Sequence, residues 1–78
     1  MTAPLTQTEQ AQLSIAFGRA MLRGHTAECH SIGENGLTVI ANRFSAARWK
    51  QEFGDTFEGA PLRVFRTIDV EALTGVAL

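Results

Sequence analysis

The chain is poor in cysteine, since Cys29 is the only one among its 78 residues. A lone cysteine excludes a disulfide within the chain and favours a reducing compartment. No apolar run approaches the roughly 20 residues that a membrane-spanning helix needs. The N-terminal segment also lacks the basic and apolar regions of a secretory signal. The sequence therefore predicts a cytoplasmic protein that has no contact with a membrane.

An excess of charge of either sign is missing as well. Lysine and arginine total 7, and aspartate and glutamate total 8, so the net charge is -1. This balance argues against a protein that holds DNA mainly through a strongly basic surface. It also argues against a heavily acidic mimic of DNA.

The chain is too short for more than one hydrophobic core. Residues 1–78 are expected to form a single domain with a thin core, because small domains bury a smaller share of their surface. Residues 1–5 and 75–78, at the two ends, are expected to be disordered.

The first strong pattern predicts a helix over residues 6–23. Thr6 and Glu9 have the spacing of a capping box, and Gly24 follows where a helix commonly ends. A single apolar stripe runs along this helix with helical spacing. The stripe consists of Leu13, Ala16, Phe17, Ala20 and Met21.

The next pattern predicts a β-hairpin. The dipeptide Asn35-Gly36 is a strong turn signal between two short strands, expected at residues 25–32 and 37–42. In the second strand, alternation places Leu37, Val39 and Ala41 on one face.

A second helix is expected to follow the hairpin. Ser45 is a suitable N-cap, with Phe44 and Trp49 placed as a hydrophobic staple across it. Trp49, Phe53 and Phe57 then share one helical face. Such an aromatic stripe is more often core than a platform for stacking bases, so we expect it to be buried.

The rest of the chain predicts one more strand and one more helix. The strand covers residues 62–68, and Asp69 is expected to cap a short helix at residues 70–78. The order is therefore α-β-β-α-β-α. This order predicts an α+β fold, a two-layer sandwich whose three-stranded sheet includes the β-hairpin.

The densest set of reactive side chains lies in the segment "HTAECH". If residues 25–32 form a strand, His25 and Cys29 point to one face while Glu28 and His30 point to the other. One strand cannot then bring three ligands together on a metal, nor place a base beside the thiol. The sequence thus predicts a non-enzymatic protein with no metal and no cofactor. In it, Cys29 is a small buried side chain, and His25 and His30 are partly exposed.

Charged side chains cluster in the second half of the chain and are the candidate partner-binding set. Arginine and carboxylate side chains form charge-assisted hydrogen bonds across protein interfaces. Each of them could instead be an ordinary solvated side chain. The set consists of Arg43, Arg48, Lys50, Glu52, Asp55, Arg63 and Arg66.

The segment "LTVIANRFSAARWKQEF" resembles part of the N-terminal domain of the bacterial replication initiator DnaA. In that family a strand ends in a "PN-x-F" turn, and the following helix carries a tryptophan and a later aromatic residue. Asn42, Phe44, Trp49 and Phe53 match this pattern in kind. The resemblance covers residues 37–53 and implies a docking module for the helicase and other replication proteins.

A second resemblance is one of class. A small, compact chain without a catalytic set is similar to the accessory proteins of phages and mobile elements, among which anti-CRISPR inhibitors are prominent. That likeness implies a protein that sterically blocks a host nucleoprotein complex, such as a CRISPR effector. We favour this inhibitor at the level of sequence, with the DnaA-like replication adaptor as the alternative. The expected partner is thus a host protein or nucleoprotein complex, with direct binding of nucleic acid as an alternative. The protein itself is expected to be a monomer or a homodimer.

Overall fold

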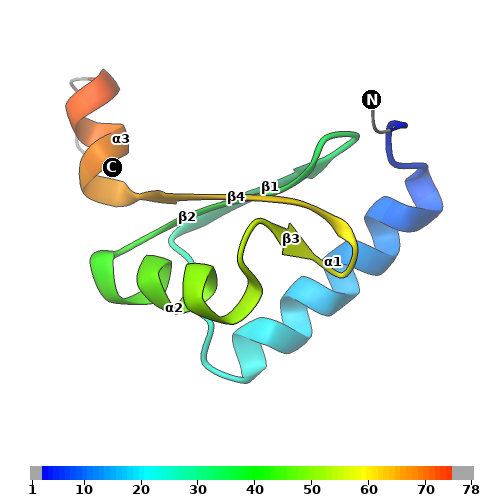
Figure 1. The fold of residues 1–78 in the computed structure, drawn as a ribbon, viewed down its shortest axis with the longest axis horizontal. Coiled ribbons are helices and arrows are strands. Elements are labelled where there is room, and N and C mark those ends of the chain that lie inside the picture. The colour runs from blue at the N-terminus through cyan, green and yellow to red at the C-terminus, as the bar shows by residue number, and fades with distance from the viewer. Residues whose placement is uncertain (1–2, 75–78) are drawn as a thin grey trace.

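Two helices cover one face of a four-stranded sheet, and a third helix continues from the end of a central strand (Figure 1). The computed structural model describes residues 3–74. Its elements, in chain order, are α1 (Gln7–Leu22), β1 (Cys29–Gly33), β2 (Gly36–Ala41), α2 (Arg43–Phe53), β3 (Thr56–Phe57), β4 (Ala60–Arg66) and α3 (Thr67–Thr74). The predicted α+β class is confirmed.

The sheet has the strand order β1-β2-β4-β3. Strands β1 and β2 form an antiparallel hairpin, β2 and β4 run parallel, and β3 pairs antiparallel with β4. Helix α2 supplies the crossover that parallel neighbours require. The prediction of a three-stranded sheet in the order α-β-β-α-β-α was wrong by one strand.

The missed strand is β3, which has only two residues. The chain reverses directly after it at Glu58 and Gly59, which have φ angles of 52° and 79°. Two successive positive φ angles are typical of the tight turns that join antiparallel strands. Because glutamate rarely adopts this conformation, the sequence contained only Gly59 as a signal for this turn.

The core lies between the sheet and the two helices below it. Leu37, Val39 and Ala41 of β2 are fully buried, as their alternation predicted. Each buried valine or leucine side chain stabilises the fold by roughly 1.5–3 kcal/mol. The other buried apolar residues are Leu13, Phe17, Ala20, Ala46, Trp49, Phe57, Ala60 and Leu62.

Helix α1 begins as the sequence predicts. The amide of Glu9 donates to the Thr6 hydroxyl, and the amide of Thr6 donates back to the Glu9 carboxylate, at 3.1 and 2.9 Å. These reciprocal bonds satisfy two amides that a helix N-terminus otherwise leaves unpaired. One position of the predicted buried stripe is wrong, since Met21 is exposed.

Strand β1 begins at Cys29, four residues later than predicted, and this reverses the expected burial of two side chains. The turn after α1 instead places His25 in the core with an exposed fraction of 7%. Cys29 pairs with Ile40 on the sheet face opposite the helices and is exposed. The residue pattern alone could not show at which residue the strand begins. Where the strand begins determines which side chains are buried.

Helix α2 also begins earlier than predicted. Asn42, rather than Ser45, is the N-cap, and its side-chain oxygen accepts a hydrogen bond from the Ser45 amide at 2.9 Å. Phe44 therefore lies inside the first turn and is exposed, so the predicted staple with Trp49 does not form. The helix ends at Phe53.

The boundaries of β4 and α3 also differ from those predicted. The strand covers Ala60–Arg66 rather than residues 62–68, and α3 starts at Thr67, so Asp69 lies in its first turn instead of capping it. The rest of the predicted last helix, residues 75–78, lies outside the described part of the chain. None of the described helices has the length and apolar character needed to cross a membrane.

Candidate functional site

Trp49 is a structural residue rather than a surface for stacking bases. Its side chain is fully buried, and its indole N–H donates to the backbone carbonyl of Thr26 at 3.0 Å. The rings of Phe17, Phe53 and Phe57 lie 5.2 to 5.7 Å from its ring. Buried aromatic pairs at this spacing stabilise a core. Phe57 belongs to this cluster from β3, although the sequence had placed it on the helix.

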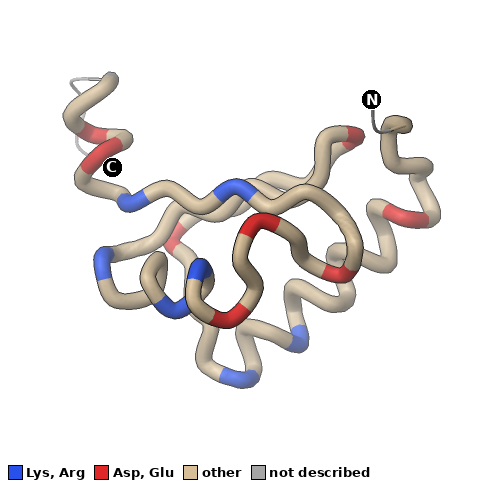
Figure 2. The backbone as a smooth tube through the Cα atoms, in the orientation of Figure 1, with Lys and Arg blue, Asp and Glu red and all other residues tan. Residues whose placement is uncertain are grey.

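Three of the predicted partner-binding cations lie around one hollow. Arg43 and Lys50 reach it from α2, and Arg66 reaches it from the end of β4. Figure 2 shows the basic positions at the start of α2 and at the end of β4 at the same end of the molecule. Ala46 and Ala47 also line this hollow, which we call the basic hollow.

One carboxylate, missed as a site residue by the sequence analysis, also lines the basic hollow. Asp69 accepts two hydrogen bonds from Arg66, 2.8 Å from Nε to Oδ2 and 3.1 Å from Nη2 to Oδ1. This side-chain hydrogen bonding lowers the pKa of Asp69 and raises that of Arg66, and the charge of Lys50 lowers the pKa of Asp69 further. The hollow therefore has three cationic side chains and one anionic side chain.

The other predicted partner-binding residues lie elsewhere. The Arg48 guanidinium donates to the carbonyl of Gly24 at 3.1 Å, and Arg48 and Glu52 line a separate hollow. Asp55 lies in the connection after α2. Arg63 is opposite Thr38 on the sheet face that α1 and α2 leave uncovered. The predicted set is therefore split among several surfaces rather than forming one basic face.

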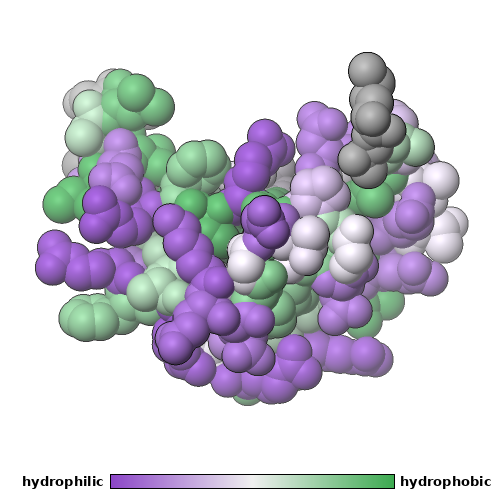
Figure 3. Space-filling view, viewed as in Figure 1, coloured by the Kyte–Doolittle hydropathy of each residue, from purple (hydrophilic) through white to green (hydrophobic). Residues whose placement is uncertain are grey.

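Two exposed apolar side chains border the charged end of the molecule. Phe44, in the first turn of α2, has an exposed fraction of 79%, and Ile68, in the first turn of α3, one of 56%. Ile68 and Arg43 line a second hollow next to the basic hollow. Figure 3 shows hydrophobic atoms over α3 beside hydrophilic side chains. Neither residue was predicted as a site residue, because the sequence pattern assigns Phe44 to a staple and Ile68 to a strand.

The residues of the "HTAECH" segment do not form a reactive set. In the described part of the chain, no group of three His, Cys, Asp or Glu residues is placed to hold a metal ion. His25 packs between Trp49 and Phe53, and its Nδ1 is buried without a hydrogen-bond partner. His30 instead stacks on Phe17, with 4.2 Å between ring centroids.

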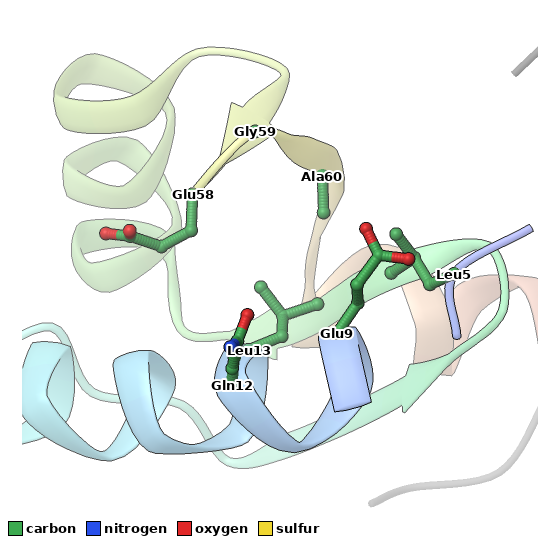
Figure 4. Close-up of a pocket in the computed structure, with 7 residues that line it drawn as sticks. All are labelled: Leu5, Glu9, Gln12, Leu13, Glu58, Gly59 and Ala60. Atoms are coloured by element: carbon green, nitrogen blue, oxygen red, sulfur yellow. The ribbon is translucent and has the colours of Figure 1, made fainter. Parts of the chain in front are cut away.

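A further pocket lies between α1 and the β3–β4 turn, and two carboxylates line it (Figure 4). The Glu9 carboxylate is engaged in the capping box of α1. Figure 4 shows the carboxylates of Glu9 and Glu58 pointing away from one another. A pair of carboxylates acting as acid and base must converge on one reacting group, so this arrangement does not support hydrolytic chemistry.

Comparisons of this chain with protein-family models, with curated proteins and with solved structures found no match.

Proposed function

We propose that this protein is a non-catalytic protein-binding module that docks through the end of the molecule where α2 and α3 begin. The observation that carries this proposal is the exposure of Phe44. The other aromatic residues of α2, Trp49 and Phe53, pack into the core cluster, whereas the Phe44 ring is left in water. Aromatic side chains are enriched at the centres of protein interfaces, where burying the ring provides much of the binding free energy.

Two further residues at this end of the molecule support a protein partner. Ile68 adds a second exposed apolar side chain at this end, and Arg43 adds a cation that can bind carboxylates. An apolar centre with a rim of charges of both signs is the usual composition of a protein interface. Direct binding of nucleic acid is less well supported, because the basic residues are split among several surfaces and carboxylates lie among them.

The partner class that we favour is the bacterial replication machinery. Residues 37–53, which carry the resemblance to the DnaA N-terminal domain, form strand β2, the Asn42 cap and helix α2. Within this segment the tryptophan is buried and Phe44 is exposed. A strand and helix joined by a turn beside a protruding aromatic residue suit an adaptor that docks on a helicase or an initiator protein.

A second candidate is a small inhibitor, encoded by a phage or mobile element, that sterically blocks a nucleoprotein complex such as a CRISPR effector. The basic hollow supports this candidate, since arginine and lysine side chains can bind acidic patches on a protein partner. Both candidates use the same end of the molecule, and they differ in the partner that is captured.

The test is a tagged capture from bacterial lysates, with and without nuclease, read by mass spectrometry, with Phe44→Ala as the matched variant. Nuclease-resistant recovery of helicase or initiator, lost in Phe44→Ala, would support the adaptor. Recovery of CRISPR-effector subunits under the same conditions would support the inhibitor. Capture that disappears on nuclease treatment would contradict both and show direct contact with nucleic acid.

A further inference from the structure

The basic hollow is built by one face of α2 together with the β4–α3 junction. Arg43, Ala46, Ala47 and Lys50 are spaced as neighbours along one side of a helix, at i, i+3, i+4 and i+7. The two alanines leave room between the long cationic side chains. The resulting hollow has a volume of about 350 Å³, and Arg66 and Asp69 line it from the other element.

The chain itself shows what chemistry this hollow accepts. The Asp69 carboxylate lies against Arg66 in a two-point arrangement, with N···O distances of 2.8 and 3.1 Å. Two parallel N–H···O bonds are the geometry by which guanidinium groups recognise carboxylates. The charge of Lys50 also stabilises the ionised Asp69. A carboxylate is therefore already held at the rim of this hollow.

The basic hollow has more cationic groups than this one carboxylate can pair. The carboxylate of Asp69 forms its ion pair with Arg66. The side chains of Arg43 and Lys50 make no hydrogen bond within the described part of the chain. Both side chains are exposed and line the same hollow. A second carboxylate could therefore bind between them without displacing Asp69.

We propose that the basic hollow binds the aspartate or glutamate side chains of an extended acidic segment in a protein partner. The proposal rests on the protein-docking function proposed above and specifies the chemistry of its partner. The acidic side chain lies over Ala46 and Ala47 and accepts hydrogen bonds from Arg43 and Lys50. Arg66, held in place by Asp69, adds a third positive charge at the rim.

An acidic peptide fits this surface better than a nucleic acid does. Asp69 lines the basic hollow and Glu71 lines the neighbouring one, so an anionic chain that crossed both would meet two carboxylates, whereas a single carboxylate bound at the basic hollow meets Asp69 alone. A phosphate backbone also needs a run of basic contacts, whereas here three cations face one point. Exposed apolar side chains beside the hollow, such as Ile68, suit the hydrophobic residues of a peptide.

The test is a titration of the ¹⁵N-labelled chain with a fluorescein-labelled peptide of alternating glutamate and glycine. The control peptide has glutamine in place of glutamate. We expect amide shifts concentrated at Arg43, Ala46, Ala47, Lys50 and Arg66, and binding by the glutamate peptide alone. Lys50→Glu should weaken binding by roughly tenfold, because it replaces a charge-assisted bond with repulsion.

Two further variants separate this site from general electrostatic attraction. Asp69→Asn removes the negative charge next to the bound carboxylate and keeps the side-chain shape, so it should strengthen binding of the glutamate peptide several-fold. Arg63→Glu makes the same change of charge as Lys50→Glu on the uncovered sheet face, and it should change the affinity by less than about twofold. Urea unfolding of each variant checks that the fold is intact.

Any of three results would overturn the proposal. The first is equal binding of the two peptides, and the second is an equal loss of affinity in Arg63→Glu and Lys50→Glu. The third is tighter binding of single-stranded oligothymidylate than of the glutamate peptide. Failure here is distinguishable from failure of the docking function. If a captured partner is lost in Phe44→Ala but retained in Lys50→Glu, the docking function stands and the acidic segment is excluded. If no partner resists nuclease, the docking function fails, while the peptide titration still reports on the hollow.

Discussion

The indole N–H of Trp49 donates a hydrogen bond to the backbone carbonyl of Thr26 at 3.0 Å. This bond joins α2 to the segment between α1 and β1, and it gives a partner to both a buried donor and its acceptor. The only tryptophan therefore belongs to the core, and Phe44 is the exposed aromatic side chain of the same helix.

Replacing Trp49 by phenylalanine should lower the free energy of unfolding by roughly 2–4 kcal/mol, because it leaves a cavity in the core and removes the hydrogen bond to Thr26. Phe44→Ala is the matched control on the same helix and should change the free energy of unfolding by less than about 0.5 kcal/mol. Urea denaturation followed by circular dichroism measures both. Equal destabilisation by the two substitutions would show that Phe44 is part of the core.

Gly36→Ala should destabilise the protein by more than about 2 kcal/mol. Gly36 has a φ of 102°, and an added Cβ would overlap the carbonyl oxygen of Pro61 on the neighbouring strand. Gly33→Ala, at the other side of the same hairpin turn, has no atom near the added Cβ and serves as the control. Thermal unfolding that gave both variants similar midpoints would contradict the parallel pairing of β2 and β4.

The side chain of Asp69 should titrate at a lower pH than an ordinary aspartate. Its hydrogen bonds to Arg66 lower its pKa in the folded protein, so the stabilisation from this pair is present above the ordinary pKa. That stabilisation is lost as the pH falls through the lowered value. Carboxyl-detected NMR should show the pKa rising towards the ordinary value in Arg66→Gln. A pKa that Arg66→Gln leaves unchanged would exclude the ion pair in solution.

Cys29 should react with iodoacetamide in the folded protein, because it is exposed on the sheet face opposite α1 and α2. Cys29→Ser should change the free energy of unfolding by less than about 0.5 kcal/mol. Mass spectrometry after brief labelling in native buffer provides the measurement. Labelling that required denaturant would place Cys29 in the core and contradict the register of β1.

The sequence correctly predicted the features that depend on residues close together in the chain. Thr6 and Glu9 form the predicted capping box, and the alternation of Leu37, Val39 and Ala41 matches their burial. Asn35-Gly36 correctly placed the hairpin turn. Each of these features is determined by residues that are close together in the chain.

The errors arose where contacts between distant segments decide the outcome. Strand β3 exists because two residues pair with β4 across a turn that contains Glu58 at positive φ, which glutamate seldom adopts. His25 is buried because the chain after α1 turns back onto α2, which no local pattern indicates.

The candidate docking surface was predictable only in part. Arg43 and Lys50 were both in the predicted set, and their helical spacing around two alanines indicates a shared face. Arg66 and Asp69 join that face only because β4 runs parallel to β2 and delivers its end beside α2. Their positions in the sequence contain no signal for this approach.

Docking through Phe44 is tested by the dissociation constant of the nuclease-resistant partner for the wild-type chain and for Phe44→Ala, measured by biolayer interferometry. We expect Phe44→Ala to weaken binding by at least roughly tenfold, as for an interface hot spot, while the free energy of unfolding stays unchanged. A dissociation constant that Phe44→Ala leaves unchanged would show that the exposed ring of α2 is not the docking surface.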